Sequence, residues 1–148
     1  MEKTSAKKEK DSTTSNVVKS FELFPNILHP LQSDEKIPLE LIKKLEEHLS
    51  SARVKKALEL VSKNNVKKYT FQPSGLAHWV VYGIEHHYLV IDHLFCSCRD
   101  FLFSCIFQRK SPACYHLLAC ELAKKVGTYE EISLSDSEYD QLMDQWLI

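Results

Sequence analysis

The chain has 148 residues, about the length of one ordinary domain, so we expect one compact unit with a tail. Hydrophobic residues make up 44% of it and charged residues 26%, which is typical of a soluble globular protein. The apolar runs are too short to span a bilayer, and residues 1–16 lack the apolar core of a secretory signal. A formal net charge of −1 argues against a protein that coats nucleic acid by bulk electrostatics. These features predict a soluble, intracellular protein.

The first 36 residues divide into two segments of different composition. Residues 1–16 are rich in Lys, Ser and Thr and too polar to bury a core, so they are predicted to be a disordered tail. Residues 17–36 form an apolar segment interrupted by Pro25 and Pro30. This pattern predicts short turns that serve as a docking or linker segment, packed either onto the domain or onto a partner. The tail also holds a weak candidate nuclear address, made of Lys7, Lys8 and Lys10.

Residues 37–127 carry the pattern of an α+β domain. Pro38 begins a helix whose apolar residues recur every three or four positions, and Ser50 and Ser51 offer an N-cap for a second helix over 52–63. Three stretches rich in β-branched and aromatic residues follow. They predict a three-stranded antiparallel meander with strands at 66–71, 76–82 and 87–93.

The remaining part of the chain predicts two further helices. One runs over 117–126 and is closed by Gly127 just past its end. Residues 128–148 are acidic, and Ser135 and Glu138 have the spacing of a capping box, which predicts a final acidic helix. The apolar stripe of that helix either docks a partner or folds back on the domain. It consists of Leu142, Met143, Trp146 and Leu147.

Charge is distributed unevenly along the chain. Residues 43–68 hold eight basic and three acidic residues, whereas residues 127–148 hold six acidic residues and no Lys or Arg. The basic part indicates either a surface that contacts phosphate or an acidic partner, or simply solvated helix faces. The same two interpretations apply to a candidate DNA-facing patch made of Lys55, Lys56, Lys67, Lys68, Arg99, Arg109 and Lys110.

All five cysteines fall between positions 96 and 120. In a reducing compartment such a cluster is more often a metal site than a disulfide framework. Zinc prefers four thiolate or imidazole ligands in a tetrahedron. On an extended chain, residues i and i+2 point to the same side, so Cys96 and Cys98 can converge on one ion. The predicted zinc ligands are Cys96, Cys98, Cys114 and His116.

The second ligand pair leaves alternatives open. Positions i and i+2 lie on nearly opposite sides of an α-helix, so Cys114 must precede the helix while His116 lies in its first turn. Cys120, four residues after His116, could replace Cys114, and His93 is a second rival ligand. In the preferred set, Cys105 and Cys120 are small buried hydrophobes.

A shell of four protein ligands predicts a structural rather than a catalytic metal. It leaves no coordination position for an activated water. The nearby carboxylate, Asp100, is interpreted as a surface charge or as a hydrogen-bond partner of the loop. We therefore expect one structural Zn²⁺ and no enzymatic activity, with a redox or hydrolytic zinc enzyme as a weaker alternative.

The two ligand pairs and their surroundings resemble a known family. The likeness rests on four strings, which are ALELV at 57–61, QPSG at 72–75, CSCRDF at 96–101 and CYHLLA at 114–119. They resemble the small SWIM zinc-finger proteins of the Shu complex, and the resemblance covers about residues 38–127.

The resemblance implies a SWIM-type zinc-binding domain whose ligands are the four residues named above. It also implies a nuclear, non-enzymatic adaptor that pairs with a RecA-like recombinase paralogue and promotes homologous-recombination DNA repair. Single-stranded DNA would then be reached through the complex, and no membrane is involved. The alternative function is a SWIM module that binds single-stranded DNA directly.

Overall fold

The frame of the structure is a mixed sheet of five strands. This computed structural model describes residues 23–33, 36–92 and 94–147. The strands are β1 (Val66–Gln72), β2 (Ala77–Tyr82), β3 (His87–Ile91), β4 (Phe95–Cys96) and β5 (Glu130–Ser135), arranged in the order β4-β3-β2-β1-β5. The first three strands form the predicted antiparallel meander, which β4 extends at one edge and β5 extends at the other. The predicted α+β class is confirmed, although the sheet is larger than predicted.

Strand β5 is the part of the sheet that the sequence analysis does not predict. The segment 128–148 is expected to be helical, but its first part pairs in parallel with β1, from Lys67–Glu130 to Gln72–Ser135. Residues of β5 alternate between exposed and half-buried positions beyond its first residue, as in an edge strand with one covered face. The capping box of Ser135 is present, and α5 (Tyr139–Leu147) follows it.

Helices α2 (Leu39–Glu46), α3 (Ser51–Ser62) and α4 (Tyr115–Val126) follow the predicted signals. The π-helix η1 (Phe101–Phe107) was not predicted, and the short 3₁₀-helix η2 (Asp136–Glu138) precedes α5. Ser50 caps α3, because its side-chain oxygen accepts a hydrogen bond from the backbone N–H of Arg53 at 3.3 Å. Gly127 ends α4 in the left-handed conformation, with φ of 75°, which a residue without a Cβ adopts at little cost. None of the helices in the described residues combines the length and apolar character that a bilayer crossing requires.

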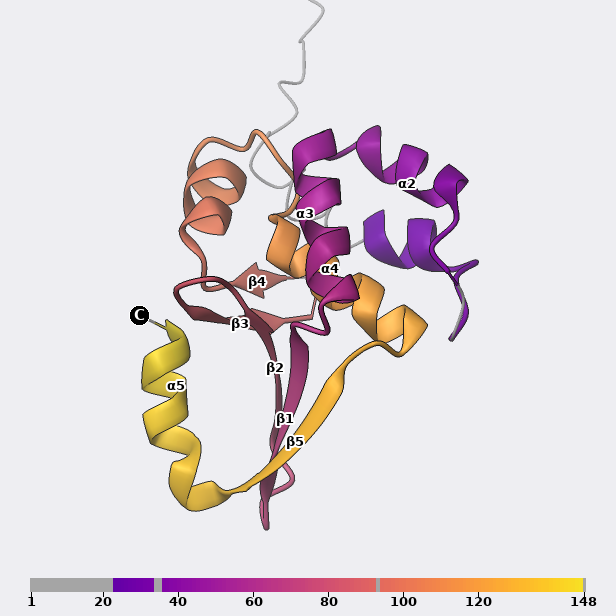
Figure 1. The fold of residues 1–148 in the computed structure, drawn as a ribbon. Helices are drawn as coiled ribbons and strands as arrows, with labels where there is room; N and C mark the ends of the chain where they lie inside the picture. Colours follow the sequence, from indigo (N-terminus) through magenta and orange to yellow (C-terminus); the bar gives the residue numbers. More distant parts are fainter. Residues whose placement is uncertain (1–22, 34–35, 93, 148) are drawn as a thin grey trace, which may run out of the picture.

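Helices cover both faces of the sheet (Figure 1). On one face α4 packs against the strands, α3 packs on α4, and α2 lies beside α3. On the other face α5 packs against β3. Neighbouring strand residues therefore enter two cores: Val81 and Val90 belong to the core with α4, whereas Val80 and Leu89 pack with Trp146 of α5.

The described part of the apolar N-terminal segment packs onto the domain. Residues 23–28 are helical, and Phe24, Leu28 and Leu31 are buried in the core that contains α4. Of the two interpretations of this segment, packing on the domain therefore holds for these residues. The predicted tail over 1–16 lies outside the described residues, as do residues 17–22.

Helix α5 folds back on the sheet rather than presenting its whole apolar stripe to solvent. Trp146 is 1% exposed, and its ring meets the Tyr69 ring edge to face at 4.8 Å. The carbonyl oxygen of Trp146 accepts a hydrogen bond from the Ser97 hydroxyl at 2.7 Å. Leu147, by contrast, is 51% exposed. The C-terminal helix is therefore part of the domain and is attached to the segment between two of the predicted ligands.

Replacing Trp146 with Ala should destabilise the protein by about 3–5 kcal/mol, because it empties the centre of the second core. The matched control is Leu147→Ala on the same helix, which should change stability by less than about 0.5 kcal/mol. Urea unfolding followed by far-ultraviolet circular dichroism measures both values. Equal unfolding midpoints for Trp146→Ala and the wild type would show that α5 does not stabilise the sheet.

Candidate metal centre

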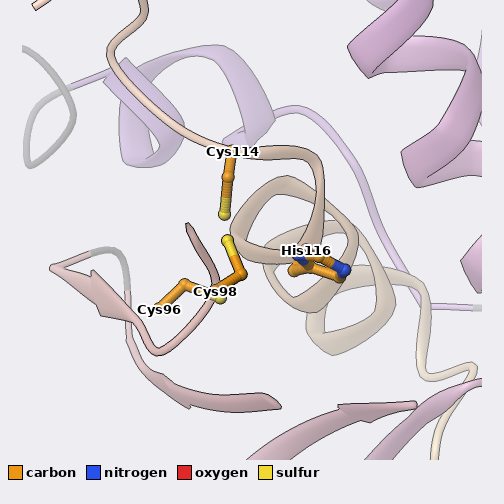
Figure 2. A group of neighbouring side chains, drawn as sticks. All are labelled: Cys96, Cys98, Cys114 and His116. Atoms are coloured by element: carbon orange, nitrogen blue, oxygen red, sulfur yellow. The ribbon is translucent and has the colours of Figure 1, made fainter. Parts of the chain in front are cut away.

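The structure brings all four predicted ligands together at one buried point (Figure 2). The ligand atoms of Cys96, Cys98, Cys114 and His116 all lie within 4.8 Å of one another. None of the four side chains is more than 5% exposed. Figure 2 shows the sulfur atoms of Cys98 and Cys114 pointing toward each other, with the His116 ring beside them.

The first ligand pair is positioned by the edge of the sheet. Cys96 is the last residue of β4 and pairs with Val90 of β3. Ser97, between the two ligands, turns its side chain the other way, where its oxygen accepts a hydrogen bond from the Leu89 N–H at 3.0 Å. The sulfur of Cys98 accepts a hydrogen bond from the Phe101 N–H at 3.3 Å. The strand ends at Cys96 and Cys98 lies in the bend that follows it, yet both sulfur atoms reach the same cluster, as the CxC spacing predicts.

The second ligand pair is positioned by the start of α4. Cys114 is the N-cap, with extended backbone angles of φ −85° and ψ 167°, and its sulfur accepts a hydrogen bond from the Leu117 N–H at 3.5 Å. His116 lies in the first turn, between the rings of Tyr88 and Tyr115, whose centroids are 4.4 and 4.1 Å from its own. The prediction that Cys114 precedes the helix is confirmed.

The rival ligands do not join this group in the described residues. Cys120 is fully buried in the core and is not part of the cluster. His93 lies outside the described residues. Cys105 is also buried, and burial raises the pKa of its thiol to about 12, so it remains a neutral thiol at physiological pH. Cys105 and Cys120 therefore have the environment of small hydrophobic residues.

The polar atoms of the cluster fit a metal ion. The Nδ1 atom of His116 is buried without a hydrogen-bond partner among the described residues, which is costly unless a metal or a proton donor satisfies it. Burial raises the pKa of the Cys114 thiol, whereas hydrogen bonds with Cys114 and Cys96 lower the pKa of the Cys98 thiol. Binding of a cation would displace the protons that remain on these thiols. Three sulfur atoms and one imidazole nitrogen are a donor set typical of zinc.

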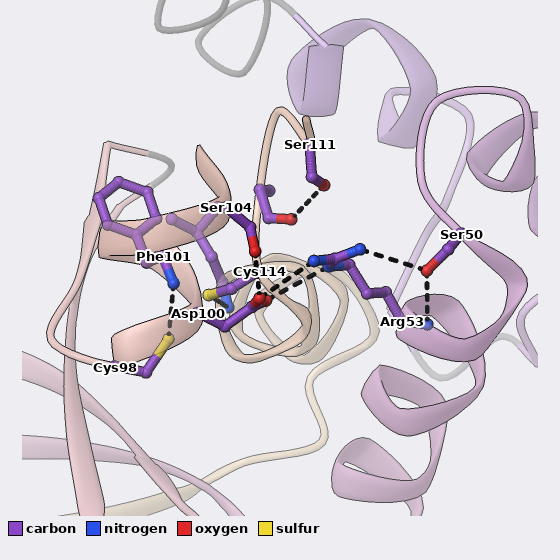
Figure 3. A network of polar contacts seen from close by, with 10 residues as sticks. Ser50, Arg53, Cys98, Asp100, Phe101, Ser104, Ser111 and Cys114 are labelled. Carbon is purple, nitrogen blue, oxygen red and sulfur yellow. Dashed lines mark hydrogen bonds and ion pairs between the residues drawn. The ribbon is translucent and has the colours of Figure 1, made fainter. Parts of the chain in front are cut away.

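An ion pair fixes the loop that follows the first ligand pair (Figure 3). The Arg53 guanidinium on α3 donates through Nε and Nη2 to the two carboxylate oxygens of Asp100, at 3.3 and 3.0 Å. The Ser104 hydroxyl donates to the same carboxylate at 2.7 Å. Asp100 therefore holds the loop to α3, in agreement with its interpretation as a hydrogen-bond partner. The sequence offers no local signal for its partner, since Arg53 lies 47 positions earlier.

The candidate DNA-facing patch does not form one uniformly free positive surface. Lys67 and Lys68 of β1 lie opposite Glu130 and Glu131 of β5, with N–O distances of 2.6 and 3.8 Å. The Lys56 ammonium lies 5.2 Å from the centre of the Tyr115 ring. Strand β5 thus neutralises part of the basic charge that the sequence assigns to this patch.

Substitution of one predicted metal ligand should greatly weaken zinc binding. Loss of a residue that only hydrogen-bonds to a ligand lowers metal affinity roughly 10–100-fold. Replacing a ligand itself, as in Cys98→Ser or His116→Ala, should lower zinc affinity by more than that. Cys105→Ser is the matched control, because this cysteine is buried outside the cluster. Zinc per chain, measured by mass spectrometry after gel filtration, should be near one for the wild type and control. Full zinc content in both ligand variants would contradict the assignment.

The chain is similar in sequence to proteins that are named for a zinc finger. No model of a known protein family matches the chain. The chain is 30% identical over 125 residues to zinc finger SWIM domain-containing protein 7 of Mus musculus, which covers 82% of this chain and 80% of that protein. It is 29% identical to the Homo sapiens protein of the same name, over 82% and 87% of the two chains. A Dictyostelium discoideum homolog is 35% identical, and the match covers 56% of this chain and about half, 54%, of that protein.

Proposed function

The chain belongs to the family of zinc finger SWIM domain-containing protein 7, and from this premise we propose that it is a non-enzymatic adaptor of homologous-recombination DNA repair. In this proposal it pairs with a RecA-like recombinase paralogue in a Shu-type complex in the nucleus. The observation that carries the proposal is the buried group of three cysteines and one histidine in a chain of this family.

One structural zinc ion is the proposed cofactor. Cys96, Cys98, Cys114 and His116 would hold it, and the ion would supply a cross-link between the edge of the sheet and the start of α4. Because four protein ligands leave no position for an activated water, this arrangement favours a structural role over a hydrolytic one. A structural zinc contributes on the order of ten kcal/mol to folding, enough to fix a small binding platform.

The proposal is tested by identifying what the protein assembles with. The tagged full chain should be purified from its own cells and the bound proteins identified by mass spectrometry. A RecA-like ATPase should be recovered at near-equal amount with the wild type and with Cys105→Ser. His116→Ala should recover at least tenfold less of it, because the platform depends on the metal. Recovery of the zinc-loaded wild type without any such ATPase would contradict the proposal.

Direct binding of single-stranded DNA is a second candidate, which a cavity beside the metal centre favours. The cavity has a volume of about 280 Å³, and its lining holds aromatic and basic side chains together with one carboxylate, that of Glu59. Aromatic rings stack on bases and lysines contact phosphates, so such a lining suits a nucleotide. Its lining includes Lys56, Lys63, Tyr82, Tyr115 and His116.

This second candidate predicts a salt-dependent DNA affinity. Lys56→Glu/Lys63→Glu should weaken binding of labelled oligo-dT about tenfold or more, whereas the matched control Lys43→Glu/Lys44→Glu on α2 should not. Fluorescence anisotropy at several salt concentrations measures both affinity and salt dependence. Equal binding by the two variants would exclude the cavity as the DNA site.

A further inference from the structure

The loop between the two ligand pairs carries apolar side chains that are not buried in the core. In the π-helix η1, Phe101 and Cys105 are buried, each at 6% exposed. Four other large apolar residues of η1 are between 39% and 65% exposed. We call these four the inter-ligand patch; it consists of Leu102, Phe103, Ile106 and Phe107. Their positions i, i+1, i+4 and i+5 place them on one side of the helix.

The inter-ligand patch lies on a well-anchored element. The Gln108 N–H donates to the Phe103 carbonyl at 2.8 Å, which is the bond that defines a π-turn, and the rings of Phe103 and Phe107 lie 5.9 Å apart. At one end, Asp100 is bound by Arg53; at the other, the Lys110 N–H donates to the Ser104 carbonyl at 2.8 Å. A fixed apolar surface loses little conformational entropy when a partner binds. Such π-turns occur frequently at functional sites.

The charges around the patch indicate what kind of surface would cover it. Arg99 and Lys110, both exposed, precede and follow η1 in the sequence. No carboxylate occurs in residues 101–113, and the one just before them, Asp100, is paired with Arg53. A second copy of this patch would bring like charges together, which disfavours self-association through it. The complementary surface is apolar and bordered by carboxylates.

We propose that the inter-ligand patch is a docking surface for a segment of the RecA-like partner that is apolar and bordered by Asp and Glu. This proposal rests on the proposed function. The two ligand pairs enclose η1 in the sequence, at 96–98 and 114–116, so the metal centre holds both ends of the docking element in place. Partner binding then depends on zinc, although zinc makes no contact with the partner.

Substitution of the patch tests the proposal while leaving the core intact. Phe103→Asp/Phe107→Asp should retain zinc and a wild-type circular dichroism spectrum, and should recover about tenfold or more less ATPase than the wild type. The matched control is Ile84→Asp in the β2–β3 turn, which is fully exposed and lies outside η1. Wild-type recovery by the double variant would overturn the proposal.

Site-specific crosslinking separates this proposal from the proposed function. The photoreactive residue p-benzoylphenylalanine is placed at Phe107, or at Ile84 as a control, in the full chain inside its own cells. A crosslink from position 107 to an apolar, carboxylate-bordered segment of a RecA-like ATPase supports both proposals. A crosslink from 107 to such a segment of a different identified protein keeps the surface but contradicts the RecA-like partner. Crosslinks to the ATPase from 84 and none from 107 overturn the docking surface alone.

Discussion

The structure depends on the meeting of two separate segments at one buried point. The CxC pair comes from the edge of the sheet and the CxH pair from the start of α4, and 15 residues of chain lie between them. A group of three thiols and an imidazole with an unpartnered nitrogen is not a stable core by itself, because buried polar atoms without partners cost free energy. A bound cation would satisfy these atoms and cross-link the sheet to the helix layer.

Other parts of the molecule are attached to this point through the residues beside the ligands. Ser97, between the two ligands of the first pair, binds both β3 and the last turn of α5. Asp100, two residues after that pair, binds Arg53 of α3. The metal centre therefore connects the helices on both faces of the sheet. In our proposal a zinc ion at this point would also hold η1 in place, so that it would control the proposed docking surface without touching it.

Much of the site could be predicted from the sequence, because its signals are local. The i, i+2 spacing of Cys96 and Cys98 and the need for Cys114 to precede a helix follow from backbone geometry alone. Strand β5 could not be predicted, since six residues of an acidic segment carry little β-propensity and gain their stability by pairing with β1, far away in the sequence. The π-helix was missed for a related reason. Its apolar run has no 3.6-residue period, and its conformation depends on anchors such as Arg53.

The measurement that tests the account most directly is a zinc titration of the metal-free full chain. Far-ultraviolet circular dichroism and tryptophan fluorescence would be followed together, because Trp79 packs against the core with α4 and Trp146 lies in the core with α5. The account predicts saturation at one zinc per chain, with a rise in the free energy of unfolding and burial of the tryptophan rings. A metal-free chain that binds no zinc, or that unfolds at the same urea concentration with and without it, would contradict the account.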